Sequence, residues 1–216
     1  MDDLLVRLSR VDACAVSDAL DKLGLAGAVS GIHRFSTDRR ISGRVVTVKL
    51  ERDDGRPSAK HLGTTAVEAA QPGDVIVIEQ RTGLDAASWG GNLSLGAQLR
   101  GVSGVIVDGP VRDIDEGRLH DFTVFAREHT ARTARGRIAE TGTNVPITVG
   151  EVTVSPGDYV VADASAVVFV AQADIERVLE AAEGIAAREQ EMADSLRQGT
   201  PISQVMGARY ETMLKR

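Results

Sequence analysis

Hydrophobic positions recur at helical spacing near both ends of the chain. Residues 3–23 carry apolar side chains three or four positions apart and are followed by Gly24, a pattern that predicts helical structure ending at that glycine. Ser17 and Asp18 fall inside this stretch, and we expect them to cap a boundary between two helices. Residues 174–197 form a longer amphipathic pattern whose far end is charged. We expect this helix, about residues 174–198, to pack on a neighbouring subunit.

Between these helical patterns, short apolar runs of a length suited to strands alternate with further helical segments and then cluster. Helices are predicted over 62–70 and 91–100, with another beginning near Asp113. The segment from Thr130 to Gly142 is rich in small polar residues and arginine, and is expected to be an exposed loop. Strands are predicted over 43–50, 75–78, 104–108, 122–126, 145–149, 152–154, 159–162 and 166–170. The pattern favours one mixed α/β layered domain spanning residues 1–216.

Composition argues against several classes of protein, namely nucleic-acid-binding, secreted and membrane proteins. The 216 residues are 43% hydrophobic and 26% charged, with a net charge of −6 and no basic patch, so nucleic acid is disfavoured as a direct partner. The one cysteine, Cys14, lies in an apolar stretch and is expected to be a small core residue. The acidic N-terminus has no signal-peptide pattern, and no apolar run approaches the length of a membrane span. We therefore expect a cytoplasmic protein without a membrane partner.

The candidate chemistry is concentrated at the two ends of one helix–strand unit. Gly90 and Gly91 precede the predicted helix, and Arg112 and Asp113 follow the next strand. A helix of about ten residues rises roughly 15 Å, and a strand of about five residues spans roughly 17 Å in return. Arg112 and Asp113 should therefore lie beside Gly90 and Gly91. Backbone amides, a guanidinium and a carboxylate in one pocket suit a small carboxylate ligand held beside a metal ion.

Each of these features also has a plain structural explanation. A glycine pair can form a simple tight turn, and Arg112–Asp113 can be an exposed arginine followed by a helix-capping aspartate. Asp115 and Glu116 could hold a metal through water or could complement the helix dipole. The sequence leaves Asp108 as a candidate wall of the pocket and Glu189 as a solvated helix residue. Scattered histidines argue against a zinc site, and the lack of lysine in these segments favours metal-assisted polarisation over a Schiff base.

The motifs resemble the RraA-like superfamily, which includes the 4-hydroxy-4-methyl-2-oxoglutarate aldolases. The resemblance depends on Pro72-Gly73-Asp74-Val75-Ile76-Val77, on Trp89-Gly90-Gly91 and above all on the segment from Arg100 to Glu116. It implies a layered α/β sandwich of the swivelling β/β/α type, with mixed sheets of short strands. It also implies a homotrimer or hexamer with sites at subunit interfaces.

The resemblance further implies roles for individual residues. In members that are enzymes, a 2-oxo acid substrate is held by the arginine matching Arg112 and by the loop matching Gly90, Gly91, Asn92 and Leu93. Asp113 would anchor Mg²⁺ or Mn²⁺, and Glu189 from a neighbouring subunit could reach the site. Related aldolases often carry an acidic residue at the position of Gly91, and Glu116 would take over part of its role in holding the metal, through water.

The resemblance leads to two functional hypotheses. The first is a divalent-metal-dependent lyase that cleaves a 4-hydroxy-2-oxo acid, or decarboxylates oxaloacetate, to give pyruvate through a metal-stabilised enolate. The second is a non-catalytic regulator of the RraA type that binds a ribonuclease or helicase partner. The presence of Asp113 and Glu116 favours the first.

Overall fold

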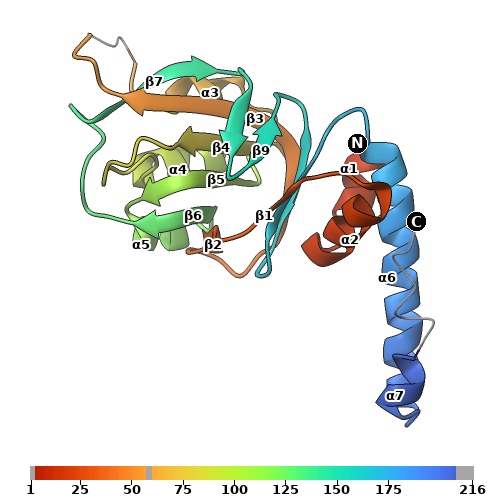
Figure 1. Ribbon diagram of the computed structural model, residues 1–216. Helices are drawn as coiled ribbons and strands as arrows, with labels where there is room; N and C mark the ends of the chain where they lie inside the picture. Colours follow the sequence, from red (N-terminus) through yellow and green to blue (C-terminus); the bar gives the residue numbers. More distant parts are fainter. Residues whose placement is uncertain (1–2, 57–59, 208–216) are drawn as a thin grey trace.

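The computed structural model describes residues 3–56 and 60–207 (Figure 1). Met1 and Asp2, at the acidic N-terminus, lie outside the described residues. The helices are α1 (Asp3–Leu8), α2 (Ala13–Leu23), α3 (Thr64–Ala69), α4 (Gly91–Leu99), α5 (Ile114–Leu119), α6 (Ile175–Arg197) and α7 (Ile202–Val205). The strands are β1 (Ala28–Val29), β2 (His33–Arg34), β3 (Ile41–Arg52), β4 (Val75–Gln80), β5 (Gly104–Val111), β6 (Thr123–His129), β7 (Ile138–Thr143), β8 (Ile147–Val149), β9 (Val152–Val154), β10 (Tyr159–Ala162) and β11 (Val167–Val170).

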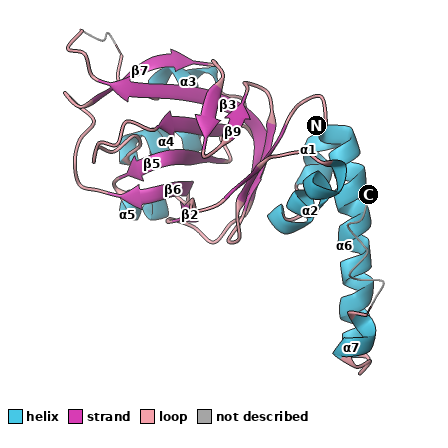
Figure 2. Ribbon diagram, viewed as in Figure 1, coloured by secondary structure: helices cyan, strands magenta, loops and turns pink. Residues whose placement is uncertain are grey.

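A curled, mixed sheet forms the centre of the molecule (Figure 2). Its strand order is β1-β11-β10-β3-β4-β5-β6-β2, with β7 also paired to β3 and with β8–β9 as a separate two-stranded sheet. Strands β3 to β6 are parallel, whereas β10, β11 and β1 are antiparallel to their neighbours. The long strand β3 joins the two parts, because residues 41–44 pair with β10 and residues 45–50 pair with β4.

Three apolar clusters separate the layers. One lies between the parallel strands and helices α3, α4 and α5, which cover one face of the sheet. A second fills the space enclosed by the other face of these strands and by β8, β9, β10 and β11. The third packs α1, α2 and α6 against the outer face of β10 and β11. The layers therefore follow the order helix, sheet, sheet, helix. The parallel strands point away from α6, so their carboxyl ends lie on the opposite side of the molecule (Figure 1).

Two Pro-Gly-Asp turns have the same geometry. Gly73 and Gly157 adopt φ of 91° and 86°, a backbone conformation that favours glycine. Asp74 accepts a hydrogen bond from the backbone amide three residues earlier at 2.8 Å, and Asp158 does the same at 2.8 Å. The aspartate thus closes each turn before β4 and β10 respectively, which explains the recurrence of the motif.

Several sequence-based expectations need correction. Ser17 and Asp18 lie within α2, and the cap is instead Asp12, whose carboxylate accepts a hydrogen bond from the Ala15 amide at 2.8 Å. Cys14 is exposed, because it lies on the outer face of α2. The segment expected to be an exposed loop contains β7, whose residues are mostly half-buried with few apolar positions and so give no clear alternation. The two-residue strands β1 and β2, and helix α7, were not predicted.

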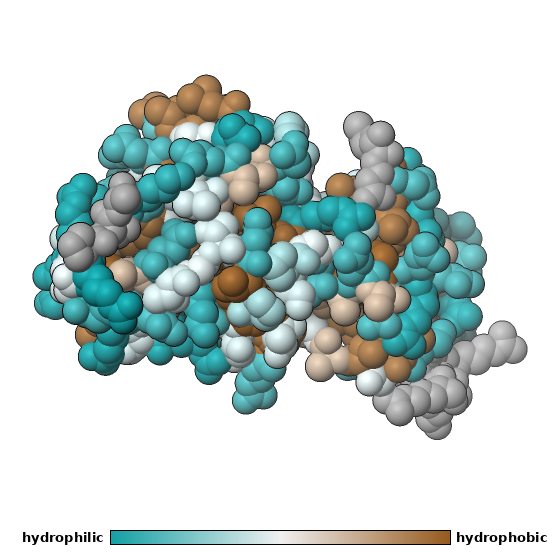
Figure 3. Space-filling model, turned by 90° about the horizontal axis from the view of Figure 1, so that it is seen from above, coloured by the Kyte–Doolittle hydropathy of each residue, from teal (hydrophilic) through white to brown (hydrophobic). Residues whose placement is uncertain are grey.

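The predicted fold class is confirmed as a mixed α/β layered structure with a long C-terminal helix. Gly24 ends α2 in the left-handed conformation, as predicted. The far half of α6 extends beyond the sheet body together with α7 (Figure 1). Seen from above, the surface is mostly hydrophilic with scattered hydrophobic patches (Figure 3). Among the described residues, no helix combines the length and apolar character needed to cross a membrane.

Candidate functional site

A cavity of about 460 Å³ lies where the parallel strands β4 and β5 end and where α4 and α5 begin. All the residues predicted from the glycine pair and the arginine–aspartate pair line it, namely Gly90, Gly91, Asn92, Leu93, Arg112, Asp113 and Glu116. Arg112 and Asp113 therefore lie at the same cavity as Gly90 and Gly91, as predicted. Helix α4 runs away from the cavity, and β5 brings the chain back to it.

Asp113 links the two halves of the site. Its Oδ2 atom accepts a hydrogen bond from the Gly91 amide at 3.1 Å and lies 3.2 Å from Nε of Arg112. The Arg112 amide in turn donates to the carbonyl of Trp89 at 3.0 Å. The Gly91 amide is thus already used by Asp113, so the amides available to a ligand are those of Asn92 and Leu93. These belong to the first turn of α4, where amides have no partner within the helix.

The backbone at the end of β5 aims Arg112 and Asp113 into the cavity. The sequence-based strand ends at Asp108 and is followed by a Gly-Pro turn, but β5 continues to Val111 through an irregularity in its pairing with β6 between Val107 and Pro110. Asp113 then adopts a left-handed conformation with φ of 57° and ψ of 41°. Aspartate tolerates this conformation better than most residues. The bend turns the chain from β5 into α5 and leaves both side chains at the cavity wall.

Two adjacent glycines make room for two carboxylates. A Cβ atom added at Gly90 would lie 2.7 Å from Oδ2 of Asp113. A Cβ atom added at Gly91 would overlap Oε2 of Glu116 and would lie 2.9 Å from the Cβ of that residue. Glu116 therefore occupies the volume into which any side chain at position 91 would extend.

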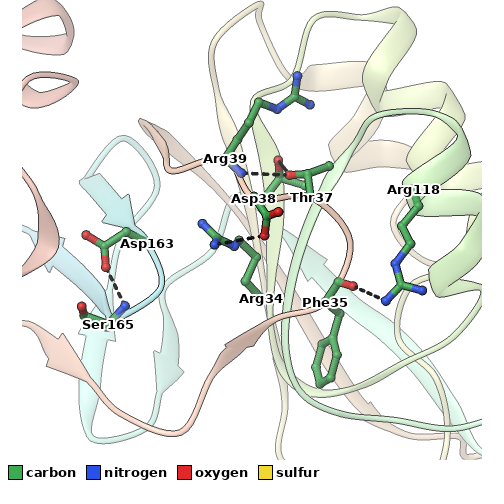
Figure 4. Close-up of polar contacts among 9 residues, drawn as sticks. Arg34, Phe35, Thr37, Asp38, Arg39, Arg118, Asp163 and Ser165 are labelled. Atoms are coloured by element: carbon green, nitrogen blue, oxygen red, sulfur yellow. Dashed lines mark hydrogen bonds and ion pairs between the residues drawn. The ribbon is translucent and has the colours of Figure 1, made fainter.

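Helix α5, which carries Glu116, is held at its outer side by the segment after β2 (Figure 4). Arg118 donates a hydrogen bond to the carbonyl of Phe35 at 3.1 Å, and Ser36 donates to the carbonyl of Phe122 at 2.6 Å. Close by, Arg34 pairs with Asp38 at 3.4 Å. The bonds of Arg118 and Ser36 thus attach the six-residue helix α5 and the chain just before β6 to the same segment.

The cavity also contains residues that were not predicted from the sequence. His61, Thr64, Ser88, Thr133 and Arg135 line its other walls. The hydroxyl of Ser88 is buried and has no hydrogen-bond partner among the described residues. Partial burial, together with the positive charges of Arg135 and Arg112, lowers the pKa of His61, so its imidazole is neutral near pH 7. Ser88 directly precedes the Trp89-Gly90-Gly91 motif, whereas the other four approach the site from separate segments that no local pattern marks.

Three acidic residues considered from the sequence lie elsewhere in this chain. Asp108 is not a wall of the cavity, because it is buried and its carboxylate accepts hydrogen bonds from Arg127 at 2.7 Å and from the Gly150 amide at 2.7 Å. Asp115 is exposed and pairs with the arginine one turn along α5 at 2.8 Å. Glu189 lies on α6, outside the cavity lining. Burial, and then the nearby carboxylates of Asp12 and Asp18, raise the pKa of Glu189.

The carboxylates in the cavity suit a hard divalent cation. Asp113 uses Oδ2 for its two contacts, and within the described residues its Oδ1 atom and the carboxylate of Glu116 accept no hydrogen bond. Mg²⁺ usually takes one or two protein carboxylates and keeps several waters. The described residues contain no cluster of three or more acidic, histidine or cysteine ligands. The donor set therefore fits Mg²⁺ or Mn²⁺ better than zinc.

Comparisons with known proteins identify relatives of this chain. A putative 4-hydroxy-4-methyl-2-oxoglutarate aldolase of Halalkalibacterium halodurans is 33% identical over 185 residues, covering 83% of this chain and 82% of that protein. Protein DlpA of Legionella pneumophila is 25% identical over 94% of this chain, which spans 33% of its length. The crystal structure of an uncharacterized protein from Pseudomonas syringae superposes with a TM-score of 0.86 at 26% identity, covering 96% of this chain and 98% of that one. Residues 13–169 match the family model described as "RraA-like: Aldolase/RraA", and the chain therefore belongs to the RraA-like family.

Proposed function

We propose that this protein is a divalent-metal-dependent carbon–carbon lyase that produces pyruvate from a 2-oxo acid. The reaction would be cleavage of a 4-hydroxy-2-oxo acid, decarboxylation of oxaloacetate, or both. The observation that supports this proposal is the meeting of Arg112, Asp113 and Glu116 in one cavity beside the Gly90–Gly91 bend. An anion-binding group and two carboxylates side by side match the needs of a charged 2-oxo acid and a cation.

Arg112 would bind the carboxylate of the pyruvyl unit. Its Nε atom faces Asp113, which leaves the two terminal nitrogens of the guanidinium to form a fork with a carboxylate. The amides of Asn92 and Leu93, at the N-terminus of α4, would add donors and a favourable helix dipole. Because Asp113 fixes the guanidinium at Nε, the substrate would meet an arginine that is already oriented.

Asp113 and Glu116 would hold the cation, with Glu116 acting through water. When bound, Mg²⁺ or Mn²⁺ would polarise the 2-oxo group and stabilise negative charge that develops on the pyruvyl unit. Cleavage of a hydroxy-oxo acid also requires loss of a proton from the 4-hydroxyl group and delivery of a proton to C3 of the pyruvyl unit. A water held between the two carboxylates would carry these protons, and the neutral His61 would offer a hydrogen bond on the other side of the cavity.

The alternative function is that of a non-catalytic regulator, since the family description joins aldolases with RraA. A regulator would bind a ribonuclease or a helicase and would not need two carboxylates directed into a cavity. Arg112, Asp113 and Glu116 therefore favour the lyase. Tight binding of such a partner by protein that releases no pyruvate would reverse this preference.

A coupled assay of pyruvate release tests the proposal. Purified protein is mixed with oxaloacetate or with a 4-hydroxy-2-oxo acid, with Mg²⁺, Mn²⁺ or a chelator. We expect turnover that the chelator abolishes, and a loss of at least about 100-fold in kcat/KM in Arg112→Ala and in Asp113→Asn. Asp115→Asn is the matched control, because this acid is two residues from Asp113 but pairs with Arg118 outside the cavity. Full activity of either site variant would contradict the assignments.

We also propose that the protein assembles as a homotrimer or hexamer through α6. This helix extends past the sheet body, and Leu196, Ile202 and Met206 near its far end are exposed. Glu189 could join a site only in a neighbouring copy, because it lies away from the cavity of its own chain. Light scattering coupled to size-exclusion chromatography gives the mass directly. A monomer at micromolar concentration would refute this proposal without affecting the assignment of Arg112 and Asp113.

A further inference from the structure

His61 contributes an imidazole to the cavity wall, and this ring is not engaged by the protein. The residue lies between β3 and α3, and it lines the cavity together with Arg112. Its ring has no hydrogen bond, ion pair or ring contact with any residue that the structure describes. Partial burial, and then the positive charges of Arg135 and Arg112, lower the pKa of His61, so Arg112 lies close enough for its charge to act on the imidazole. A neutral imidazole carries one donor and one acceptor, and both are available to a ligand.

The turn that carries His61 packs against the wall of the same cavity. Gly63 adopts φ of 79°, and a Cβ atom added there would lie 3.3 Å from Cδ1 of Leu93 and 3.4 Å from Cζ3 of Trp89. The carbonyl of His61 accepts hydrogen bonds from the hydroxyl of Thr64 at 2.7 Å and from its amide at 3.3 Å. The turn is therefore closed by its own hydrogen bonds and contacts two residues that line the cavity.

Glu140, on β7, holds this turn from outside the cavity. Its Oε2 atom accepts a hydrogen bond from the Gly63 amide at 2.7 Å, across 77 positions of the chain. Its Oε1 atom accepts a hydrogen bond from the hydroxyl of Thr143. The pairing of β7 with β3 is irregular here, because Lys49 faces Gly142 whereas the next residue of β3 faces Glu140. Such a β-bulge redirects side chains and is frequent beside active sites.

The bond from Gly63 to Glu140 also has a plain structural role. Gly63 precedes α3 and has no side chain that could cap the helix, so Glu140 satisfies an amide at the helix start. This role alone gives no reason for an unengaged imidazole two residues earlier, beside Arg112. The two roles make different predictions, because only a positioning role requires that the effect of Glu140 on ligand binding pass through His61.

We propose that Glu140 is a positioning residue, which through the Gly63 amide holds the imidazole of His61 against a 2-oxo acid bound at Arg112. The ring of His61 forms a hydrogen bond with an oxygen atom of this ligand, whereas Glu140 touches neither the ligand nor the cation. The inference rests on the proposed function, since it adds a binding residue and its support to the same cavity.

Nuclear magnetic resonance tests the contact without turnover. Pyruvate is titrated, with Mg²⁺, into protein labelled with ¹⁵N, and His61→Gln identifies the signals of the His61 ring. The indole of Trp89, the one tryptophan of the chain, lines the cavity and reports that it is occupied. We expect the signals of Trp89 and His61 to shift together. The other histidines do not line the cavity and should keep their signals, namely His33, His120 and His129.

The same titration measures the contribution of Glu140 to the affinity for pyruvate. His61→Gln should weaken binding by about three- to tenfold, as the loss of one hydrogen bond predicts. Glu140→Ala should weaken binding to a similar extent, whereas Glu140→Gln should keep most of the wild-type affinity, because its amide oxygen can still accept the Gly63 N–H group. In protein that already carries His61→Gln, Glu140→Ala should have no further effect on affinity.

Glu79→Ala is the matched control. Glu79 is half-buried like Glu140 and accepts a hydrogen bond from the Thr148 amide at 2.8 Å, but it lies outside the cavity lining. This variant should lose stability and keep the wild-type affinity for pyruvate.

Two results would overturn the inference and leave the lyase proposal intact. One is a shift of the Trp89 signal without a shift of His61, and the other is a pair of losses from Glu140→Ala and His61→Gln that simply add. The lyase proposal alone fails if the expected shifts occur but the protein releases no pyruvate from oxaloacetate or from a hydroxy-oxo acid. No shift of Trp89 would contradict the binding of a pyruvyl unit in this cavity, and with it both proposals.

Discussion

The substitution Gly91→Ala should separate the stability of the protein from its affinity for a cation. The new methyl group would overlap Oε2 of Glu116. Since non-bonded carbon atoms approach to about 3.5–4 Å, the carboxylate must retreat by roughly 2 Å. Glu116 is exposed, so its carboxylate can turn toward solvent, but its Cβ would still lie 2.9 Å from the new methyl group, and α4 and α5 must move slightly apart. Gly91 has no positive φ, and alanine in a helix is more favourable than glycine by about 0.5–1 kcal/mol.

The consequence for cation binding follows from the same displacement. Mg²⁺ holds its ligands at about 2.0–2.1 Å in a strict geometry. A carboxylate that moves by roughly this distance can no longer bind the ion or accept a hydrogen bond from a water on the ion. Loss of an outer-shell partner typically costs about 10- to 100-fold in metal affinity, or about 1.4–2.7 kcal/mol. We therefore expect weaker binding of Mn²⁺ and slower pyruvate release, with little change in melting temperature, because the helix propensity of alanine offsets the cost of the small shift between α4 and α5.

Calorimetric titration with Mn²⁺ and thermal unfolding in a chelator measure the two quantities separately. Gly96→Ala is the control on the same helix, because its nearest neighbour would be Cγ1 of Val67 at an ordinary 3.7 Å. The double variant with Glu116→Ala tests the cause of the lost affinity, because without the Glu116 carboxylate the methyl group at position 91 no longer displaces a metal-binding group. Wild-type affinity for Mn²⁺ in Gly91→Ala, or losses that simply add in the double variant, would refute the reasoning.

Two further predictions concern stability. Ser88→Ala should raise the free energy of unfolding by about 1 kcal/mol in urea titrations, because it removes a buried hydroxyl that has no partner among the described residues; a clear decrease would show that the hydroxyl is satisfied. The hydrogen bond from Arg7 lowers the pKa of Glu183 below its ordinary value of 4.5, so the ion pair stabilises the fold above pH 4.5 and is lost as the pH falls through the lowered pKa. Both side chains are partly exposed, so the pair contributes less than about 1 kcal/mol, and Glu183→Gln should flatten the dependence of stability on pH in this acidic range only. An identical pH dependence in both proteins would mean that other carboxylates govern acid unfolding.

Sequence reasoning located the cavity because the relevant geometry is local. The predicted lengths of the helix and the strand nearly cancel, and although β5 continues to Val111, Arg112 and Asp113 do return to the Gly90–Gly91 bend. The two Pro-Gly-Asp turns are local in the same sense, since their dihedral angles depend on the residues of the turn itself. Local propensity and element length therefore account for the principal site residues.

The features that the sequence did not predict depend on contacts between distant segments. His61 and Arg135 line the cavity because separate loops converge there, and nothing next to either residue signals this. The start of α2 was misplaced although its cap, Asp12, is local; the carboxylate of Asp163 adds a hydrogen bond from the Ala13 amide across 150 positions. Asp108 was assigned to the pocket, but Arg127, on the neighbouring strand β6, holds it away from the cavity. In these cases the position of a residue in the fold depends on its partners more than on its residue type.

The third apolar cluster has a consequence for the synthesis of the protein. The apolar faces of α1 and α2 find their partners in β10, β11 and α6, so side chains from positions 8–20 are covered by side chains from positions 159–185. While the ribosome extends the chain, the central strands can collapse early, but these first helices stay uncovered until nearly the whole polypeptide has emerged. The nascent chain therefore exposes an apolar N-terminal segment for most of translation, and this segment is buried only when β10, β11 and α6 have been synthesised.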